Sequence, residues 1–145
     1  MNFHTAAPAA YRAMLSLEKY LAETQLQPLH KELIKIRASQ LNGCAYCIDM
    51  HTRDARRLGE TEQRIYTLQV WRDTTFFTEE EQAILALTEE MTLIQNRVSD
   101  ETYNRAAQLF SEAYLAEMMM AVIIINGWNR IGVATGLMPA VGEAV

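Results

Sequence analysis

The chain has 145 residues, of which 50% are hydrophobic and 21% are charged. This length suits one domain with its own core and is too short for two. A net charge of −5 without any Lys/Arg-rich block argues against nucleic acids and anionic membrane surfaces as partners. The two cysteines do not make a secreted disulfide framework, and no basic segment followed by an apolar one opens the chain. We therefore expect a cytoplasmic protein.

The first part of the chain is expected to be helical. Residues 1–7 are expected to form a loose arm, and apolar residues then recur at helical spacing over 8–23. A second helix is expected over 28–41, because Pro28 suits a first turn and apolar residues follow along one side.

A turn separates this second helix from the next one. Asn42-Gly43 is a strong turn dipeptide, and the apolar residues after it recur at intervals of three and four. This spacing predicts a helix that begins near Cys44 and ends at Leu58, where Gly59 supplies a C-terminal stop. The short turn would make the two helices an antiparallel hairpin.

The remaining helices are marked by capping residues. A short helix is expected after Thr61, and Thr78 with Glu81 three residues later forms a capping-box pattern that opens a helix to about residue 95. Ser99 caps the next helix, and Ser111 caps a last long helix. Because no segment alternates convincingly with a period of two, we expect an all-α, single-domain bundle of about six to seven helices over 1–145, with its core at about 26–95.

The last helix contains a run, residues 118–125, that is apolar on all sides. The run is far shorter than the ~20 residues that cross a bilayer, so we expect a buried segment and no membrane span. A helix of this kind in a small domain is hard to cover with one layer of neighbours, which indicates a subunit interface.

Both cysteines lie together, so any thiol chemistry must occur there. On the predicted helix Cys44, Cys47 and His51 share one face. Side chains three residues apart on a helix are about 5–6 Å apart at Cβ, close enough for a disulfide after modest adjustment. The two sulfurs can therefore alternate between dithiol and disulfide.

A thiol at Cys47 also needs a proton acceptor. A free thiol has a pKa of about 8.5, and the helix N-terminus helps Cys44 but hardly Cys47. Counted outward from the turn, Glu32 and His51 differ in axial position by about 3 Å, at about 1.5 Å per residue. We expect them to stand side by side, with His51 accepting the proton and Glu32 orienting or relaying.

These residues carry a family resemblance. Glu32, Cys44-Ala45-Tyr46-Cys47 and His51, followed by Arg53-Asp54-Ala55-Arg56 and Gly59, resemble the carboxymuconolactone decarboxylase superfamily in its alkylhydroperoxidase D-like branch. The resemblance extends over about 26–91 and includes the later-helix residues Asn126, Asn129 and Arg130.

The resemblance implies a function. The second cysteine, here Cys47, would attack a hydroperoxide and become a sulfenic acid, and the first, Cys44, would condense with it to a disulfide. The family's glutamate and histidine relay falls on Glu32 and His51. The resemblance further implies a dithiol reductant, with a lipoyl-bearing protein as one candidate, and a homo-oligomer that is a trimer or a hexamer. No cofactor or metal is expected.

One residue departs from the family pattern. The best-known members have a histidine immediately before the second cysteine, where this chain has Tyr46. A phenol can donate a hydrogen bond but is a poor base at neutral pH. Two consequences stay open: the relay runs without that group, or the activity is weaker or different.

Other interpretations stay open beside this one. The cysteines could be inert buried residues, or they could bind zinc with His51, although all three ligands lie on one helix. Covalent haem attachment is excluded, because position 48 is isoleucine rather than histidine. At the level of function, the rivals are a lyase like the name-giving decarboxylases and a non-catalytic, redox-sensing helical oligomer.

For the other polar residues, the sequence predicts surface positions or structural contacts. His4 and His30 are expected at the surface. The polar face of the cysteine helix is expected to hold its arginines, which could also stabilise a thiolate or attract an acidic reductant. These are Arg53, Arg56 and Arg57. The late-helix residues Asn126, Asn129 and Arg130 are expected to form a structural hydrogen-bond network.

Overall fold

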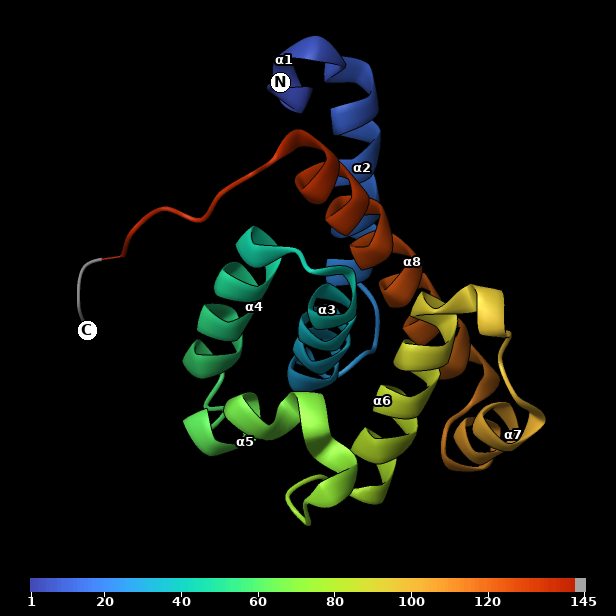
Figure 1. Ribbon diagram of the computed structural model, residues 1–145. Coiled ribbons are helices and arrows are strands. Elements are labelled where there is room, and N and C mark those ends of the chain that lie inside the picture. The colour runs from blue at the N-terminus through green and yellow to red at the C-terminus, as the bar shows by residue number, and fades with distance from the viewer. Residues whose placement is uncertain (143–145) are drawn as a thin grey trace.

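The computed structural model describes residues 1–142, which contain eight α-helices, two short 3-10 helices and no strand (Figure 1). The prediction of an all-α fold is confirmed. The α-helices are α1 (Phe3–Ala6), α2 (Pro8–Ala22), α3 (Pro28–Asn42), α4 (Ala45–Arg57), α5 (Glu62–Thr67), α6 (Glu79–Thr92), α7 (Asp100–Leu109) and α8 (Glu112–Thr135). The 3-10 helices are η1 (Leu68–Asp73) and η2 (Ile94–Asn96).

The predicted hairpin is formed by α3 and α4. Helix α3 ends in Gly43, whose φ of 69° places it in the left-handed region that glycine adopts without strain. Cys44 then caps α4, and α3 lies between α4 on one side and α6 on the other, with α8 packed across it (Figure 1). The motif therefore sits at one end of the central helix.

The core consists of two buried clusters. The larger one joins α3, α6 and α8 and includes both cysteines together with Leu21, Ile34, Ile84 and Ile125. The smaller one lies where α3, α4 and α6 meet η1, around Ile36, Ala55, Leu68, Trp71 and Leu85. Because the cysteines belong to the main core, their positions are fixed by packing on several helices.

The helix starts follow the capping signals. Thr78 and Glu81 form a complete capping box on α6, and the side chains of Ser99 and Ser111 accept the expected backbone hydrogen bonds at α7 and α8. Thr61 does the same at α5. These local predictions are confirmed.

Two expectations for single segments were wrong. Residues 3–6, expected to be part of a loose arm, form the one-turn helix α1, because the side chain of Asn2 accepts a hydrogen bond from the backbone of Thr5. His30, expected at the surface, is only 5% exposed. Its Nδ1 lies 2.7 Å from the Tyr114 hydroxyl, and its ring packs edge-on against Phe110. Burial lowers the pKa of His30.

Helix α8 is long and apolar enough, by length and composition alone, to cross a membrane. In this fold it packs against α2, α3, α4, α6 and α7 and buries two polar residues, Asn126 and Asn129. It is therefore a core helix here, as the sequence predicted. Its apolar run is not covered on all sides, because Ile123 is 52% exposed.

Candidate redox site

The two cysteines form a disulfide at the start of α4. Their Cα atoms are 5.3 Å apart. Cys44 is the N-cap residue, and its sulfur accepts a hydrogen bond from the backbone N–H of Cys47 at 3.3 Å. Both residues are buried. The spacing of three residues thus places the sulfurs within bonding range, as predicted.

Glu32 on α3 and His51 on α4 face one another across the hairpin. Nδ1 of His51 lies 2.9 Å from Oε2 of Glu32, and both side chains are largely buried. Since a carboxylate only accepts hydrogen bonds, Nδ1 carries the proton and Nε2 is left as the ring nitrogen able to take one up. The predicted proximity of Glu32 and His51 is present in the structure.

A cavity of about 810 Å³ opens beside the disulfide. Cys47 and His51 lie in its wall, whereas Cys44 is not among the residues that line it. Most of the wall is apolar or aromatic, and its main side chains are Phe3, Tyr11, Leu15, Tyr46, Met50, Trp128 and Ile131. A cavity of this size accommodates an organic molecule.

A half-buried ion pair borders both this cavity and a second, smaller one. Nζ of Lys35 is 3.0 Å from Oε2 of Glu18, and both residues border both cavities. The second cavity, of about 280 Å³, is lined by Glu32, whereas His51 lines only the first. The Glu32–His51 pair therefore reaches from one cavity to the other.

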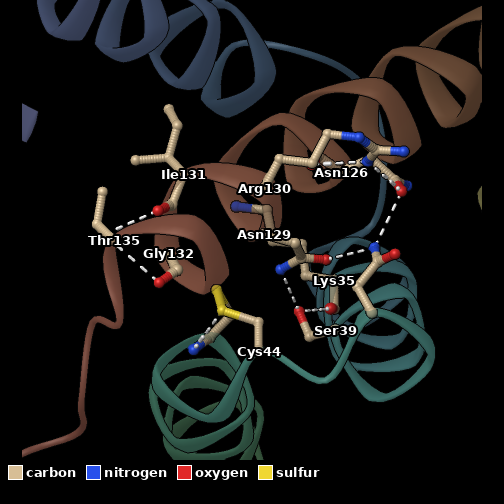
Figure 2. The surroundings of a disulfide bond; sticks show 11 residues. Lys35, Ser39, Cys44, Asn126, Asn129, Arg130, Ile131, Gly132 and Thr135 are labelled. Atoms are coloured by element: carbon tan, nitrogen blue, oxygen red, sulfur yellow. Dashed lines mark hydrogen bonds between the residues drawn. A yellow bond between two sulfur atoms is a disulfide. The ribbon is translucent and has the colours of Figure 1, made fainter.

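The buried asparagines connect α8 to the turn before Cys44. Nδ2 of Asn42 donates to Oδ1 of Asn126 at 3.0 Å and to Oδ1 of Asn129 at 2.9 Å. Asn129 in turn donates to Ser39 on α3 (Figure 2). Arg130 is exposed at its outer edge and donates to Asn126. These residues form the structural network that the sequence predicted.

The site also contains side chains of the types that bind metals. The sulfurs are bonded to each other, and a disulfide sulfur lacks the thiolate charge with which cysteine binds zinc. Within the described part of the chain, Glu32, His51 and Asp54 form a group whose donor atoms lie within 4.8 Å of one another. Asp54 is also paired with Arg57, at 2.6 Å.

The arginines of α4 lie on its polar face, as expected. Arg53, Arg56 and Arg57 each pair with an acidic neighbour, namely Asp49, Glu62 and Asp54. Because these carboxylates neutralise them, they do not form a free positive patch beside the sulfurs.

Sequence reasoning missed Lys35, Trp128 and Gly132 as site residues. They reach the site from α3 and α8, and each lines the cavity that Cys47 faces. Lys35 and Trp128 are ordinary helix residues in the sequence, so no local signal marks them. The one hint was that the resemblance extends to the later helix around Asn129.

The sequence matches the carboxymuconolactone decarboxylase family over residues 8–90. It is 45% identical over 137 residues to the uncharacterized protein YdfG of Bacillus subtilis (strain 168), covering 94% of this chain and 93% of that relative. The chain belongs to the carboxymuconolactone decarboxylase family.

Solved structures place it within the alkylhydroperoxidase D-like branch. A protein of unknown function from Agrobacterium tumefaciens, ATU0492, described as a candidate antioxidant defence protein AhpD, superposes with a TM-score of 0.95 at 35% identity. The match covers 98% of both chains. The debrominase Bmp8 has a TM-score of 0.84 at 21% identity, covering 94% of this chain and 74% of its own, and shares the fold.

Proposed function

We propose that this protein is a thiol-dependent hydroperoxide reductase. The Cys47 thiolate attacks the distal oxygen of a hydroperoxide and becomes a sulfenic acid as the O–O bond breaks. The alkoxide leaves and takes up a proton to become an alcohol. The Cys44 thiolate displaces hydroxide, released as water after protonation, and the disulfide forms. An external dithiol then restores both thiols and is itself oxidised to a disulfide.

One observation supports this proposal above the others. Cys47 and His51 line the same cavity, and the carboxylate of Glu32 holds the ring of His51 from behind. This arrangement supplies a nucleophile, a proton acceptor and an orienting group, as activated thiols require. Cys44 is not among the residues that line the cavity, which suits a residue that resolves an intermediate rather than one that meets the substrate.

Mass spectrometry of the reduced protein tests the proposal. One equivalent of cumene hydroperoxide should remove two protons from the wild type, and a dithiol should restore the original mass. Cys44→Ser should stop at a sulfenic acid on Cys47, whereas Cys47→Ser should not react. Thiols that stay inert would contradict the proposal and favour the lyase or a non-catalytic redox-sensing oligomer.

The remaining features extend the proposal. The reductant is a dithiol, with a lipoyl-bearing protein as one candidate, and the working form is a cytoplasmic homo-oligomer, a trimer or a hexamer. Steady-state assays with free dihydrolipoamide, compared with a lipoyl domain, test the reductant. A rate that is no higher with the domain would argue against a protein partner.

A second candidate is the reductive removal of a halogen from an aromatic ring. The aromatic cavity wall favours it, and the structural neighbour Bmp8 is a debrominase that has been solved in complex with 2,3,4-tribromopyrrole. In such a reaction Cys47 would take up the halogen, the ring would gain a proton, and Cys44 would expel halide as the disulfide forms. Bromide release from 2,3,4-tribromopyrrole tests this activity, and no release would exclude that substrate.

A further inference from the structure

Gly132 on α8 lies directly against the redox pair. Figure 2 shows the sulfur of Cys44 pointing from the start of α4 toward this residue. A methyl group placed on Gly132 would lie 3.2 Å from Sγ of Cys44 and 3.8 Å from Sγ of Cys47.

The backbone gives no reason for a glycine at this position. Gly132 lies inside α8 and is not one of the glycines with positive φ, which in the described chain are Gly43, Gly59 and Gly136. Alanine would fit the same helix and would favour it, because glycine is among the weakest helix formers. The reason for a glycine at position 132 is therefore the limited room next to the sulfurs.

The position of α8 at this contact is also fixed. Asn129, one turn before Gly132, is fully buried and holds both Asn42 and Ser39 through its side-chain amide. Asn42 is two residues before Cys44. The same network thus ties the helix that carries Gly132 to the turn that carries Cys44, and little slack remains to absorb an added methyl group.

We propose that Gly132 is a positioning residue that sets the equilibrium between the disulfide and dithiol forms of the pair. In the disulfide form, Sγ of Cys44 lies next to the position that a methyl group on residue 132 would occupy. When the pair accepts two electrons and two protons from a dithiol, the sulfur–sulfur bond breaks and the Cys44 side chain can turn away. A methyl group at position 132 therefore opposes the disulfide more than the dithiol.

The test is a redox titration of the full-length protein against dithiothreitol in oxygen-free buffer at neutral pH. The oxidised fraction is read by thiol alkylation and mass spectrometry. Gly132→Ala should shift the equilibrium constant about fivefold or more toward the dithiol, where a tenfold shift corresponds to about 30 mV. An unchanged constant, or a shift toward the disulfide, would overturn the proposal.

Gly127→Ala is the matched control, because it makes the same substitution on the same helix. A methyl group there meets only the flexible end of the Met14 side chain. Its equilibrium constant should stay within about twofold of wild type. An equal shift in both variants would show that the effect belongs to α8 in general and would also overturn the proposal.

A double-mutant cycle keeps the test decisive if Gly132→Ala is too unstable to titrate. Removing the sulfur that the new methyl group meets should relieve the clash, so Cys44→Ala with Gly132→Ala should unfold at no lower urea concentration than Cys44→Ala alone. A lower midpoint for the double variant would contradict the contact.

The proposal rests on the redox pair of the proposed function. Neither measurement involves a hydroperoxide, so a lack of peroxidase activity would not contradict the proposal for Gly132.

Discussion

At the scale of single residues, the proposed reaction depends on a proton acceptor that is held in place. The ring of His51 is fixed through Nδ1 by Glu32, from a different helix, so its free nitrogen keeps one orientation. The thiolate, not the thiol, is the nucleophile, so a group that accepts the thiol proton speeds the reaction. Removing the Glu32 carboxylate should therefore lower the reaction rate of Cys47 more than the stability of the fold.

Glu32→Gln tests whether Glu32 supports His51 in this way. Because glutamine carries no charge and cannot stabilise a protonated His51, kcat/KM for cumene hydroperoxide should fall about 100-fold or more. Stopped-flow or coupled assays measure the change, and Glu23→Gln at an exposed position is the matched control. A loss below about tenfold would show that Glu32 is not part of the relay.

Tyr46→His tests the departure from the family pattern. The Glu32–His51 pair is complete without a second histidine, and Tyr46 stands in the cavity wall. We therefore expect this substitution to change kcat/KM by less than about fivefold, much less than Glu32→Gln does. A much larger gain would mean that the tyrosine limits the native activity.

At the scale of the elements, the hairpin was predictable because its signals are local. Asn42-Gly43 marks the turn, the helical spacing marks both helices, and counting residues from the turn places Glu32 opposite His51. The capping box of α6 and the serine caps of α7 and α8 were predictable for the same reason. His30 was misread because the aromatic rings that bury it, Phe110 and Tyr114, come from segments far along the chain. The contact of Gly132 with the sulfurs was invisible for the same long-range reason.

The asparagine network should contribute strongly to stability. Asn129→Ala removes one hydrogen bond from Asn42, which keeps its bond to Asn126, and one to Ser39, which keeps its bond to the Lys35 carbonyl. Because each lost bond costs about 0.5–1.5 kcal/mol, the free energy of unfolding should fall by about 1–3 kcal/mol. Urea denaturation measures it. Asn104→Ala, on the exposed face of α7, is the control and should stay within about 0.5 kcal/mol of wild type. Equal effects would argue against a structural role of the network.

His30 should make stability depend on pH. Burial lowers its pKa in the folded protein, so below its ordinary value of 6.5 the unfolded chain binds a proton that the folded protein does not. The free energy of unfolding should therefore fall as pH falls from about 7.5 to 5.5, and His30→Asn should reduce that fall. Urea titrations at both pH values measure it. An undiminished fall in the variant would exclude His30 as its source.

At the scale of the whole molecule, apolar side chains remain uncovered on the core helix. Ile123 and Val133 of α8 are each about half exposed, although both chain neighbours of Ile123 are buried. Apolar residues on an otherwise buried helix are typical of subunit contacts. This agrees with the oligomer proposed above.

Ile123→Glu tests that interface. A charge there should shift a trimer or hexamer toward monomers, because a carboxylate buried between apolar surfaces is unfavourable. Size-exclusion chromatography with light scattering measures the mass. Tyr66→Glu, at an exposed site on α5, is the control and should leave the mass unchanged. A wild type that is already monomeric would exclude the proposed assembly.

The cavity whose wall contains Cys47 but not Cys44 offers the oxidant and the reductant the same sulfur to approach. The oxidant and the reductant would then bind in this cavity one after the other. Turnover should therefore follow ping-pong kinetics. A large excess of dithiol should lower the rate, because the dithiol then competes with the peroxide for the cavity.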